Sequence, residues 1–268
     1  MEKIELKELQ DYVYEIFKEF DRICRKHNIK YSMEGGTLLG AVKYHNFVPW
    51  DDDIDVIMKR DEYKKFLKIA PKELNEKYFL QSYNNVPEFP LNYAKLCMKQ
   101  SQIFDYDYSH LKNMCHGIFI DIFPIDHVIP SKLKIHTSIV GVLTSARKTK
   151  LKVNFGNVKF VKKLIYKLLS LLPMKVLNKM MDKSCTKYNN KNTGYYYEIC
   201  NSNKKFKPLP AEIYENIIEL QFRDQKFMAV EKYDEFLKSR FSRNYMTELP
   251  AEKDRKPSHC QNIKIFKD

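Results

Sequence analysis

The acidic run at residues 51–55 constrains this chain more than any other feature, because four of its five residues are aspartates. On a strand, Asp51, Asp53 and Asp55 would project to one face and Asp52 to the other. Carboxylates this close repel each other when they are partly desolvated, and a hard divalent cation, Mg²⁺ or Mn²⁺, removes that cost. The alternative is a solvated acidic loop, against which the apolar residues on both sides of the run argue.

A glycine pair precedes this run. Gly35, Gly36 and Thr37 follow a predicted short strand at 29–34 and open a predicted short helix at 37–42. Glycines let the backbone approach a ligand closely, and the amides at the start of a helix point their positive dipole outward. The turn therefore suits a phosphate, although the same sequence also forms ordinary turns.

A third acidic feature is Asp121, which stands inside the apolar run 117–123. A lone carboxylate in a buried strand needs a partner. Taken alone, Asp121 indicates a structural hydrogen-bond acceptor or half of a salt bridge. Taken with Asp53 and Asp55, it becomes a candidate third carboxylate for a metal ion.

The hydrophobic periodicity predicts an α+β chain. The expected helices lie at 6–27, 37–42, from Asp61 to about Pro71, at 211–219 and at 231–242, with further helix in the basic segment. The expected strands lie at 29–34, 53–58, 78–83, 93–98, 117–123 and 222–228. This order predicts a mixed-sheet core at 1–130, a basic helical insertion at 131–191 and a C-terminal part at 192–268 that completes the core.

The charge is concentrated in one segment. The chain carries a formal charge of +13, yet residues 131–191 hold 15 lysines and arginines against one acid, Asp182. A uniformly basic protein indicates nucleic acid, whereas one basic block beside a near-neutral body indicates a dedicated contact surface. We expect an anionic membrane surface as the partner and no nucleic acid. The alternative is a solvated helical lid with Leu164, Leu168 and Leu172 packed on the core.

Cysteine usage and hydropathy indicate a cytoplasmic protein. The six cysteines show no CxxC spacing, the first residues do not read as a signal peptide, and reduced thiols are the simplest interpretation. The longest apolar stretch of the basic segment, 135–146, is much shorter than the roughly 20 residues of a membrane span.

Three motifs strongly resemble the LicD family of bacterial phosphocholine transferases, which are related to the eukaryotic fukutin group. They are YSMEGGTLLGAV at 31–42, PWDDDIDV at 49–56 and IDIFP at 120–124. Residues 245–250 and His259 extend the resemblance, which leaves the basic block largely uncovered. Two departures stand out: Lys43 replaces the usual arginine, and His259 precedes Cys260 where the family often has paired histidines.

The resemblance implies a nucleotidyltransferase-like fold and assigns site residues. Asp53, Asp55 and Asp121 would be catalytic and would hold Mg²⁺ or Mn²⁺. The expected substrate-binding residues are Gly35, Gly36, Thr37, Lys43, His45, Lys95 and Trp50.

The resemblance also implies an activity. CDP-choline would donate phosphocholine to a sugar hydroxyl of a lipid-linked glycan precursor, such as a teichoic acid, at the inner face of the cell membrane, with release of CMP. One alternative is transfer of another CDP-linked group: ribitol phosphate, glycerol phosphate or phosphoethanolamine. A second is a nucleotide-binding or nucleic-acid-binding protein without turnover.

Overall fold

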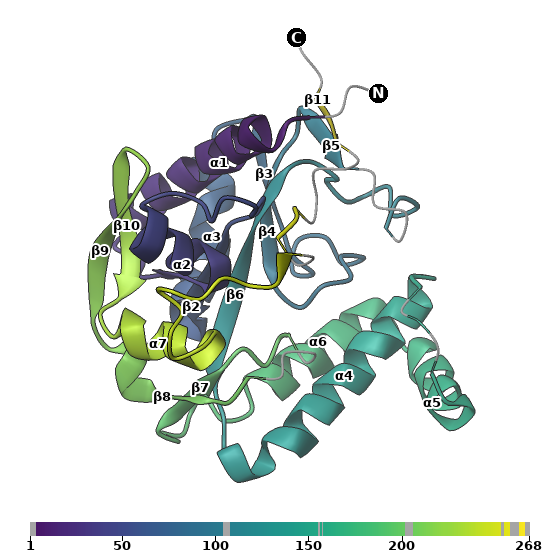
Figure 1. Cartoon of the computed structure of the whole chain (residues 1–268). Coiled ribbons are helices and arrows are strands. Elements are labelled where there is room, and N and C mark those ends of the chain that lie inside the picture. The colour runs from purple at the N-terminus through teal and green to yellow at the C-terminus, as the bar shows by residue number, and fades with distance from the viewer. Residues whose placement is uncertain are drawn as a thin grey trace.

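A mixed β-sheet forms the centre of the molecule in the computed structural model, which describes residues 4–103, 108–154, 156, 158–201, 206–252, 255–257 and 263–265. The strand order is β1-β2-β6-β4-β3, and β7 and β8 extend the sheet from β6 (Figure 1). These strands are β1 (Ser32–Met33), β2 (Asp55–Lys59), β3 (Tyr78–Gln81), β4 (Ala94–Met98), β6 (Phe119–His127), β7 (Tyr195–Tyr197) and β8 (Leu209–Pro210). Two separate antiparallel pairs join β9 (Ile217–Phe222) with β10 (Gln225–Val230), and β5 (Ser101–Ile103) with β11 (Ile263–Ile265).

Helices and two short 3₁₀ turns surround this sheet. The helices are α1 (Leu6–Lys26), α2 (Gly35–Tyr44), α3 (Arg60–Glu73), α4 (Leu133–Lys150), α5 (Phe160–Ser170), α6 (Met174–Cys185) and α7 (Tyr233–Arg240). The 3₁₀ turns are Pro130–Lys132 and Ala211–Tyr214. The α+β class expected from the sequence is confirmed.

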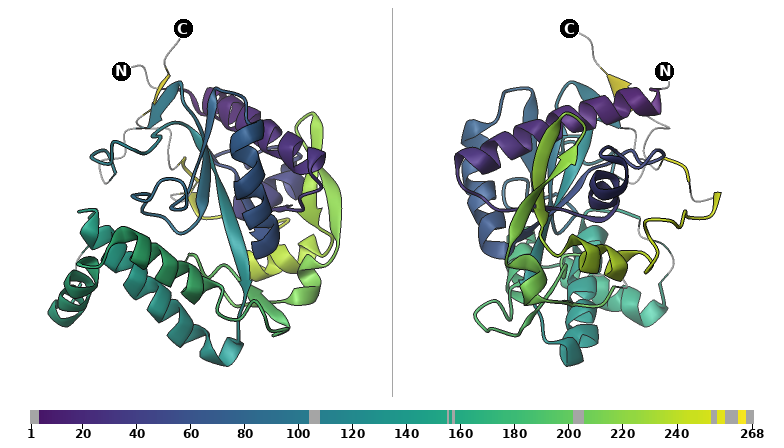
Figure 2. Two further views of the ribbon diagram at one scale, coloured as in Figure 1. Left: turned by 180° about the vertical axis from the view of Figure 1, so that it is seen from behind. Right: turned by 60° about the vertical axis from the view of Figure 1, so that its left-hand side comes forward.

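Helices α1 and α3 cover one face of the sheet (Figure 2). The apolar stripe of α1 is completely buried, and Phe17 and Phe20 pack against Tyr31 and Phe66. The β9–β10 hairpin closes the edge beside β1, and the Val230 amide donates to the Ser32 hydroxyl. The opposite face of the sheet is thereby left for the polar residues described below.

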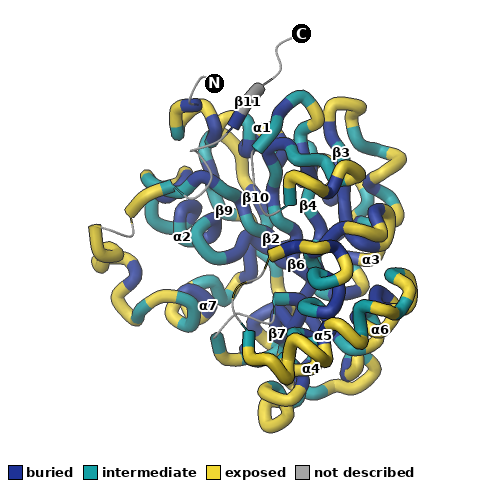
Figure 3. Tube along the Cα trace, turned by 90° about the vertical axis from the view of Figure 1, so that its right-hand side faces the viewer, coloured by how far each residue is buried: buried dark blue, intermediate teal, exposed yellow. Residues whose placement is uncertain are grey.

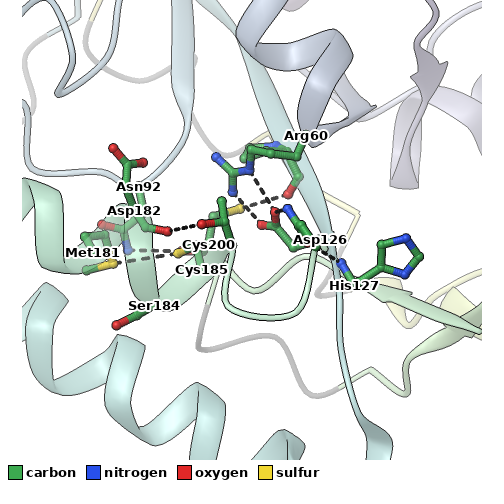
Figure 4. Close-up of polar contacts among 12 residues, drawn as sticks. Arg60, Asn92, Asp126, His127, Met181, Asp182, Ser184, Cys185 and Cys200 are labelled. Carbon is green, nitrogen blue, oxygen red and sulfur yellow. Dashed lines mark hydrogen bonds and ion pairs between the residues drawn. The ribbon is translucent and has the colours of Figure 1, made fainter. Parts of the chain in front are cut away.

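Buried polar contacts join the basic segment to the core. Arg60 of α3 donates to Asp126 at the end of β6, with Nε 2.8 Å from Oδ1 (Figure 4). The side-chain amide of Asn189, which follows α6, donates to the same carboxylate at 2.6 Å and accepts from the backbone amide of His127 at 2.8 Å.

Arg147 of α4 is fully buried. It donates to the Asn92 side chain and the Phe89 carbonyl, at 2.6 Å each. Helices α4 and α6 are thus anchored to the core, while α5 packs on α4 at the periphery.

Three sequence predictions need correction. Residues 51–54 form a loop and the strand begins at Asp55, although burial alternates through the run as a strand would. The predicted helix at 211–219 is a 3₁₀ turn followed by strand β9. The turn between β9 and β10 contains no glycine. Arg223 takes the left-handed conformation there, at φ 55°, and the usual sequence signal of a hairpin is therefore missing. Helix α3 continues through Pro71 to Glu73.

Among the described residues, no helix is long and apolar enough to cross a membrane.

Candidate functional site

Three charged side chains lie in one row across the sheet. Asp55 and Asp121 are register partners on the parallel strands β2 and β6, and Lys95 of β4 is the partner of Asp121 on its other side. Register partners on neighbouring strands project to the same face about 5 Å apart. The fold therefore brings together two acidic residues that are 66 positions apart in the sequence.

Lys95 provides the counter-charge of this row. Its Nζ lies 3.0 Å from Asp121 Oδ1, and the two side chains are only 13% and 15% exposed. The same ammonium lies over the Phe119 ring. Asp121 Oδ1 is buried and, within the described part of the chain, accepts no hydrogen bond. This oxygen is therefore held by its ion pair with Lys95.

Tyr93 lies beside the two carboxylates. Its ring packs on Phe123 with centroids 4.4 Å apart. Burial, followed by the charges of Asp121 and Asp55, raises the pKa of the Tyr93 phenol well above its ordinary value. The phenol therefore stays protonated and can donate a hydrogen bond. No feature of the sequence places Tyr93 in the site rather than in the core.

The glycine turn contacts the acidic run directly. Gly35 has φ 53° and starts α2, whose first amides have no acceptor within the helix. A Cβ on Gly36 would lie 2.2 Å from Asp51 Oδ2, so no larger residue fits without displacing that carboxylate. The turn therefore presents backbone amides and carboxylates to the same space.

Thr37 is buried and contacts the backbone of Asp55. Its Oγ1 accepts a hydrogen bond from the Asp55 amide at 2.9 Å, and the Glu34 amide donates to the Asp55 carbonyl at 3.0 Å. These two bonds fix the start of α2 to the residue that opens β2. In this structure Thr37 positions Asp55.

The acidic loop holds carboxyl groups close together. Burial, followed by the neighbouring charge of Asp53, raises the pKa of Asp51 to about 8. The Gln10 side chain donates to the Asp51 carbonyl at 2.7 Å and anchors the loop to α1. The loop thus carries the electrostatic repulsion that the sequence predicts.

A cavity of about 490 Å³ opens beside these carboxylates. Gly36, Trp50, Asp51 and Asp53 line one side of it. The other side is formed by residues after α7, which include Phe241, Tyr245, Glu248 and Leu249. Composition gave no reason to assign these last residues to the site, and only the resemblance at 245–250 pointed toward them.

Lys43 holds the second wall of the cavity in place. Its Nζ donates to the carbonyls of Tyr245 and Glu248, at 3.2 Å each. His45 is exposed at the far end of α2, about 15 Å from Gly35 at 1.5 Å per residue. Its carbonyl accepts from the Arg223 amide at 2.7 Å. The structure therefore does not bring Lys43 or His45 to the carboxylate row, and His259 lies outside the described residues.

The residue types fit a divalent cation, but in this structure the side chains do not surround a common point at which a cation could bind. Within the described ranges, no three carboxylate, imidazole or thiol groups lie close enough to hold a metal ion. Asp55 and Asp121 are nevertheless adjacent in register, Asp53 precedes Asp55 by two residues, and Asp121 Oδ1 is buried without a hydrogen bond. Oxygen ligands of this kind suit Mg²⁺.

This fold and this row of carboxylates define a nucleotidyltransferase-like domain. Residues 28–155 match the LicD/FKTN/FKRP nucleotidyltransferase domain. The chain is also 30% identical to the lipopolysaccharide cholinephosphotransferase LicD of Haemophilus influenzae, over 99% of this chain and 100% of that protein. The chain belongs to the LicD family and is an enzyme of the phosphotransferase class.

Two shorter similarities cover only 22% and 19% of this chain. A Rickettsia typhi protein, RT0683, is 38% identical over 60 residues, and a Rickettsia prowazekii protein, RP689, is 47% identical over 51 residues. Each match covers 19% of the rickettsial protein, and both proteins are uncharacterized. They therefore add no information on substrates.

Proposed function

We propose that this enzyme transfers phosphocholine from CDP-choline to a sugar hydroxyl of a glycan precursor and releases CMP. The observation that carries the proposal is the Asp55–Asp121 register pair, whose Asp55 is bound to the glycine turn through Thr37. Asp53, two residues before Asp55, lines a cavity whose wall includes Trp50 and Phe241. The full-length similarity to a cholinephosphotransferase supports the same reaction. A lipid-linked acceptor of the teichoic acid type, and thus a position at the inner face of the membrane, is part of the proposal.

The donor is proposed to lie in the 490 Å³ cavity. Its diphosphate would lie against the amides that begin α2, where the positive end of the helix dipole favours negative charge. Its quaternary ammonium would lie near Trp50, Phe241 and Glu248, because aromatic faces and carboxylates both attract such cations. The Arg255 guanidinium lies 5.7 Å from the centroid of the Trp50 ring, and this contact of a cation with the ring supports the placement.

Asp53, Asp55 and Asp121 would hold Mg²⁺ or Mn²⁺, which when bound neutralises charge on the phosphate oxygens. The acceptor oxygen forms its bond to the phosphorus that carries choline, and the bond from that phosphorus to the CMP oxygen breaks. Asp121 is proposed to take the proton of the attacking hydroxyl, because it is a carboxylate next to Asp55 in the row and a carboxylate can act as a general base. Lys95, 3.0 Å away, holds that carboxylate in place.

The proposal is tested by CMP release from CDP-choline in the presence of Mg²⁺, with and without a glycan acceptor. We expect CMP release to require the acceptor and to be abolished by EDTA. A matched donor series of CDP-ribitol, CDP-glycerol and CDP-ethanolamine distinguishes the alternatives. Faster turnover of any of these than of CDP-choline would reassign the donor, and no turnover of the whole series would overturn the proposed function.

A further inference from the structure

Helices α4, α5 and α6, here called the helical unit, carry most of the exposed large apolar side chains that the structure describes. Nine such residues lie on these helices and a tenth, Leu171, lies in the link between α5 and α6, against four in all other described segments. The ten are Ile135, Ile139, Phe160, Val161, Leu164, Ile165, Leu168, Leu171, Val176 and Met180. A contiguous apolar surface of this kind on a folded protein marks an interaction site.

Helix α5 turns its apolar face outward. Tyr166 is its one buried residue, whereas Phe160, Leu164 and Leu168 are 81%, 50% and 59% exposed. At about 100° per residue, the exposed apolar positions of α5 and Leu171 span an arc of roughly 140° opposite Tyr166. The leucine stripe therefore does not pack on the core, and the helical-lid alternative is wrong for Leu164 and Leu168.

An apolar groove adjoins this face. It encloses about 520 Å³ between the three helices and is lined by Lys134, Ile135, Ser138, Ile139, Val142, Leu143, Leu169 and Met180. Leu169 is about 40° from the edge of the exposed arc of α5 on the helical wheel. The groove and the face of α5 thus belong to one surface. Helix α5 itself lies at the end of the molecule farthest from the β9–β10 hairpin (Figures 1 and 3).

Lysines surround the apolar arc. Lys159, Lys162, Lys163 and Lys167 are exposed and lie outside the arc on the wheel of α5, and the 131–191 segment has Asp182 as its one acid. Of its 15 basic residues, Arg147 is buried in the fold, and Lys148 has an interaction of its own. Two copies of this surface would repel each other, which argues against a homodimer across it. A nucleic acid would match the charge but not the apolar arc.

We propose that the helical unit docks on a lipid bilayer that contains anionic lipids. The outward face of α5 inserts its apolar side chains at the level of the acyl chains, and the flanking lysines extend to the phosphate groups. Charge complementarity selects this occupant, because the surface combines apolar residues with a strong positive charge. The proposal goes beyond the transferase reaction and does not depend on it.

The experiment is co-sedimentation of the full chain with vesicles of phosphatidylcholine and phosphatidylglycerol in equal amounts, compared with pure phosphatidylcholine. We expect binding to the mixed vesicles that declines in high salt. Lys163→Ser with Lys167→Ser should weaken it roughly thirtyfold, because each lysine near an anionic surface contributes about a factor of five. Lys64→Ser with Lys68→Ser on α3 removes the same charge at the same spacing and should leave binding within twofold of wild type.

A second variant tests the apolar face. Leu164→Gln with Leu168→Gln changes two exposed side chains, so we expect an unchanged melting temperature and weaker binding to the mixed vesicles. Three outcomes would each overturn the proposal. They are equal binding to both vesicle types, an equal loss of binding in the α3 control, and dimerisation that Leu164→Gln with Leu168→Gln abolishes. Binding is measured without substrates, so an inactive enzyme that still binds vesicles would count against the proposed function alone.

Discussion

Arg240 of α7 reaches Glu34, the residue that immediately precedes the glycine turn, with Nε 3.3 Å from Oε1. The two side chains are 4% and 3% exposed, and the same guanidinium lies 3.4 Å from Glu198. The rings of Phe206 and Phe236 flank it at 4.8 and 4.7 Å. Burial lowers the pKa of Arg240 and the two carboxylates raise it, with a net upward shift, so the guanidinium stays charged. This contact ties the wall of the cavity after α7 to the turn that opens α2.

Removal of this cation should destabilise the protein strongly. Arg240→Met leaves two buried carboxylates without their counter-charge, and we expect a loss of about 3–5 kcal/mol in the free energy of unfolding. Urea denaturation measures this loss. Lys238→Met on the same helix breaks only the exposed pair with Asp234 and should cost less than about 1 kcal/mol. Similar losses in the two variants would show that the buried ion pair contributes no more to the free energy of unfolding than the exposed pair.

The carboxylate row should be essential for turnover but not for folding. Asp55→Asn and Asp121→Asn keep the side-chain volume and remove a charge, so we expect kcat/KM to fall by roughly a thousandfold, which corresponds to a few kcal/mol of charge stabilisation. The assay is CMP release, with circular dichroism to verify the fold. Asp61→Asn, on an exposed carboxylate at the start of α3, is the matched control and should retain activity. Full activity of Asp55→Asn would remove Asp55 from the site.

Gly36 should tolerate no side chain. Gly36→Ala places a methyl group 2.2 Å from Asp51 Oδ2, so the carboxylate must move out of the cavity that it lines. We expect at least a tenfold rise in KM for CDP-choline, measured by initial rates. Gly194→Ala introduces strain at φ 73° with no atom within 4 Å of the new carbon. It should lower stability by about 1–2 kcal/mol and leave KM unchanged. An unchanged KM in Gly36→Ala would refute the close approach of turn and loop.

Cys115 should be the most reactive thiol among the cysteines that the structure describes. A hydrogen bond with Cys97 is the main reason why the pKa of Cys115 falls to about 7, whereas burial raises the pKa of Cys24, Cys97 and Cys200. Since the thiolate reacts, alkylation of Cys115 by iodoacetamide should increase with pH and reach half its maximum near pH 7. Peptide mass spectrometry identifies the site. Cys97→Ala should move the midpoint upward, and a midpoint near 8.5 in the wild type would contradict the prediction.

The sequence predicts the strands of the core better than the contacts between distant segments. Alternation and the motifs locate β2 and β6, because a strand and its acidic residue are encoded locally. The resemblance then assigns the aspartates of the two strands to one site. The register that places Asp55 beside Asp121 comes from sheet pairing, which has no local signal.

The other contacts of the site depend on tertiary structure. Lys43 was expected to contact phosphate, yet it donates to carbonyls at 245 and 248, about 200 residues away. The Glu34–Arg240 bridge spans a similar separation. For α5 the sequence leaves two interpretations open, a membrane-facing helix and a lid packed on the core, because an amphipathic pattern does not say whether its apolar side meets protein or another phase.

Trp50 should decide between choline and uncharged donors. An aromatic face contributes about 0.5–2 kcal/mol to the binding of a quaternary ammonium, so Trp50→Ala should raise KM for CDP-choline by roughly 3- to 30-fold. CDP-glycerol lacks the cation, and its KM should change by less than twofold. Trp50→Phe keeps a weaker π face and should fall between wild type and Trp50→Ala. Tyr195→Ala, which removes an exposed ring on β7, is the control and should affect neither donor. An equal rise in KM for the two donors would show that Trp50 shapes the cavity and does not recognise choline.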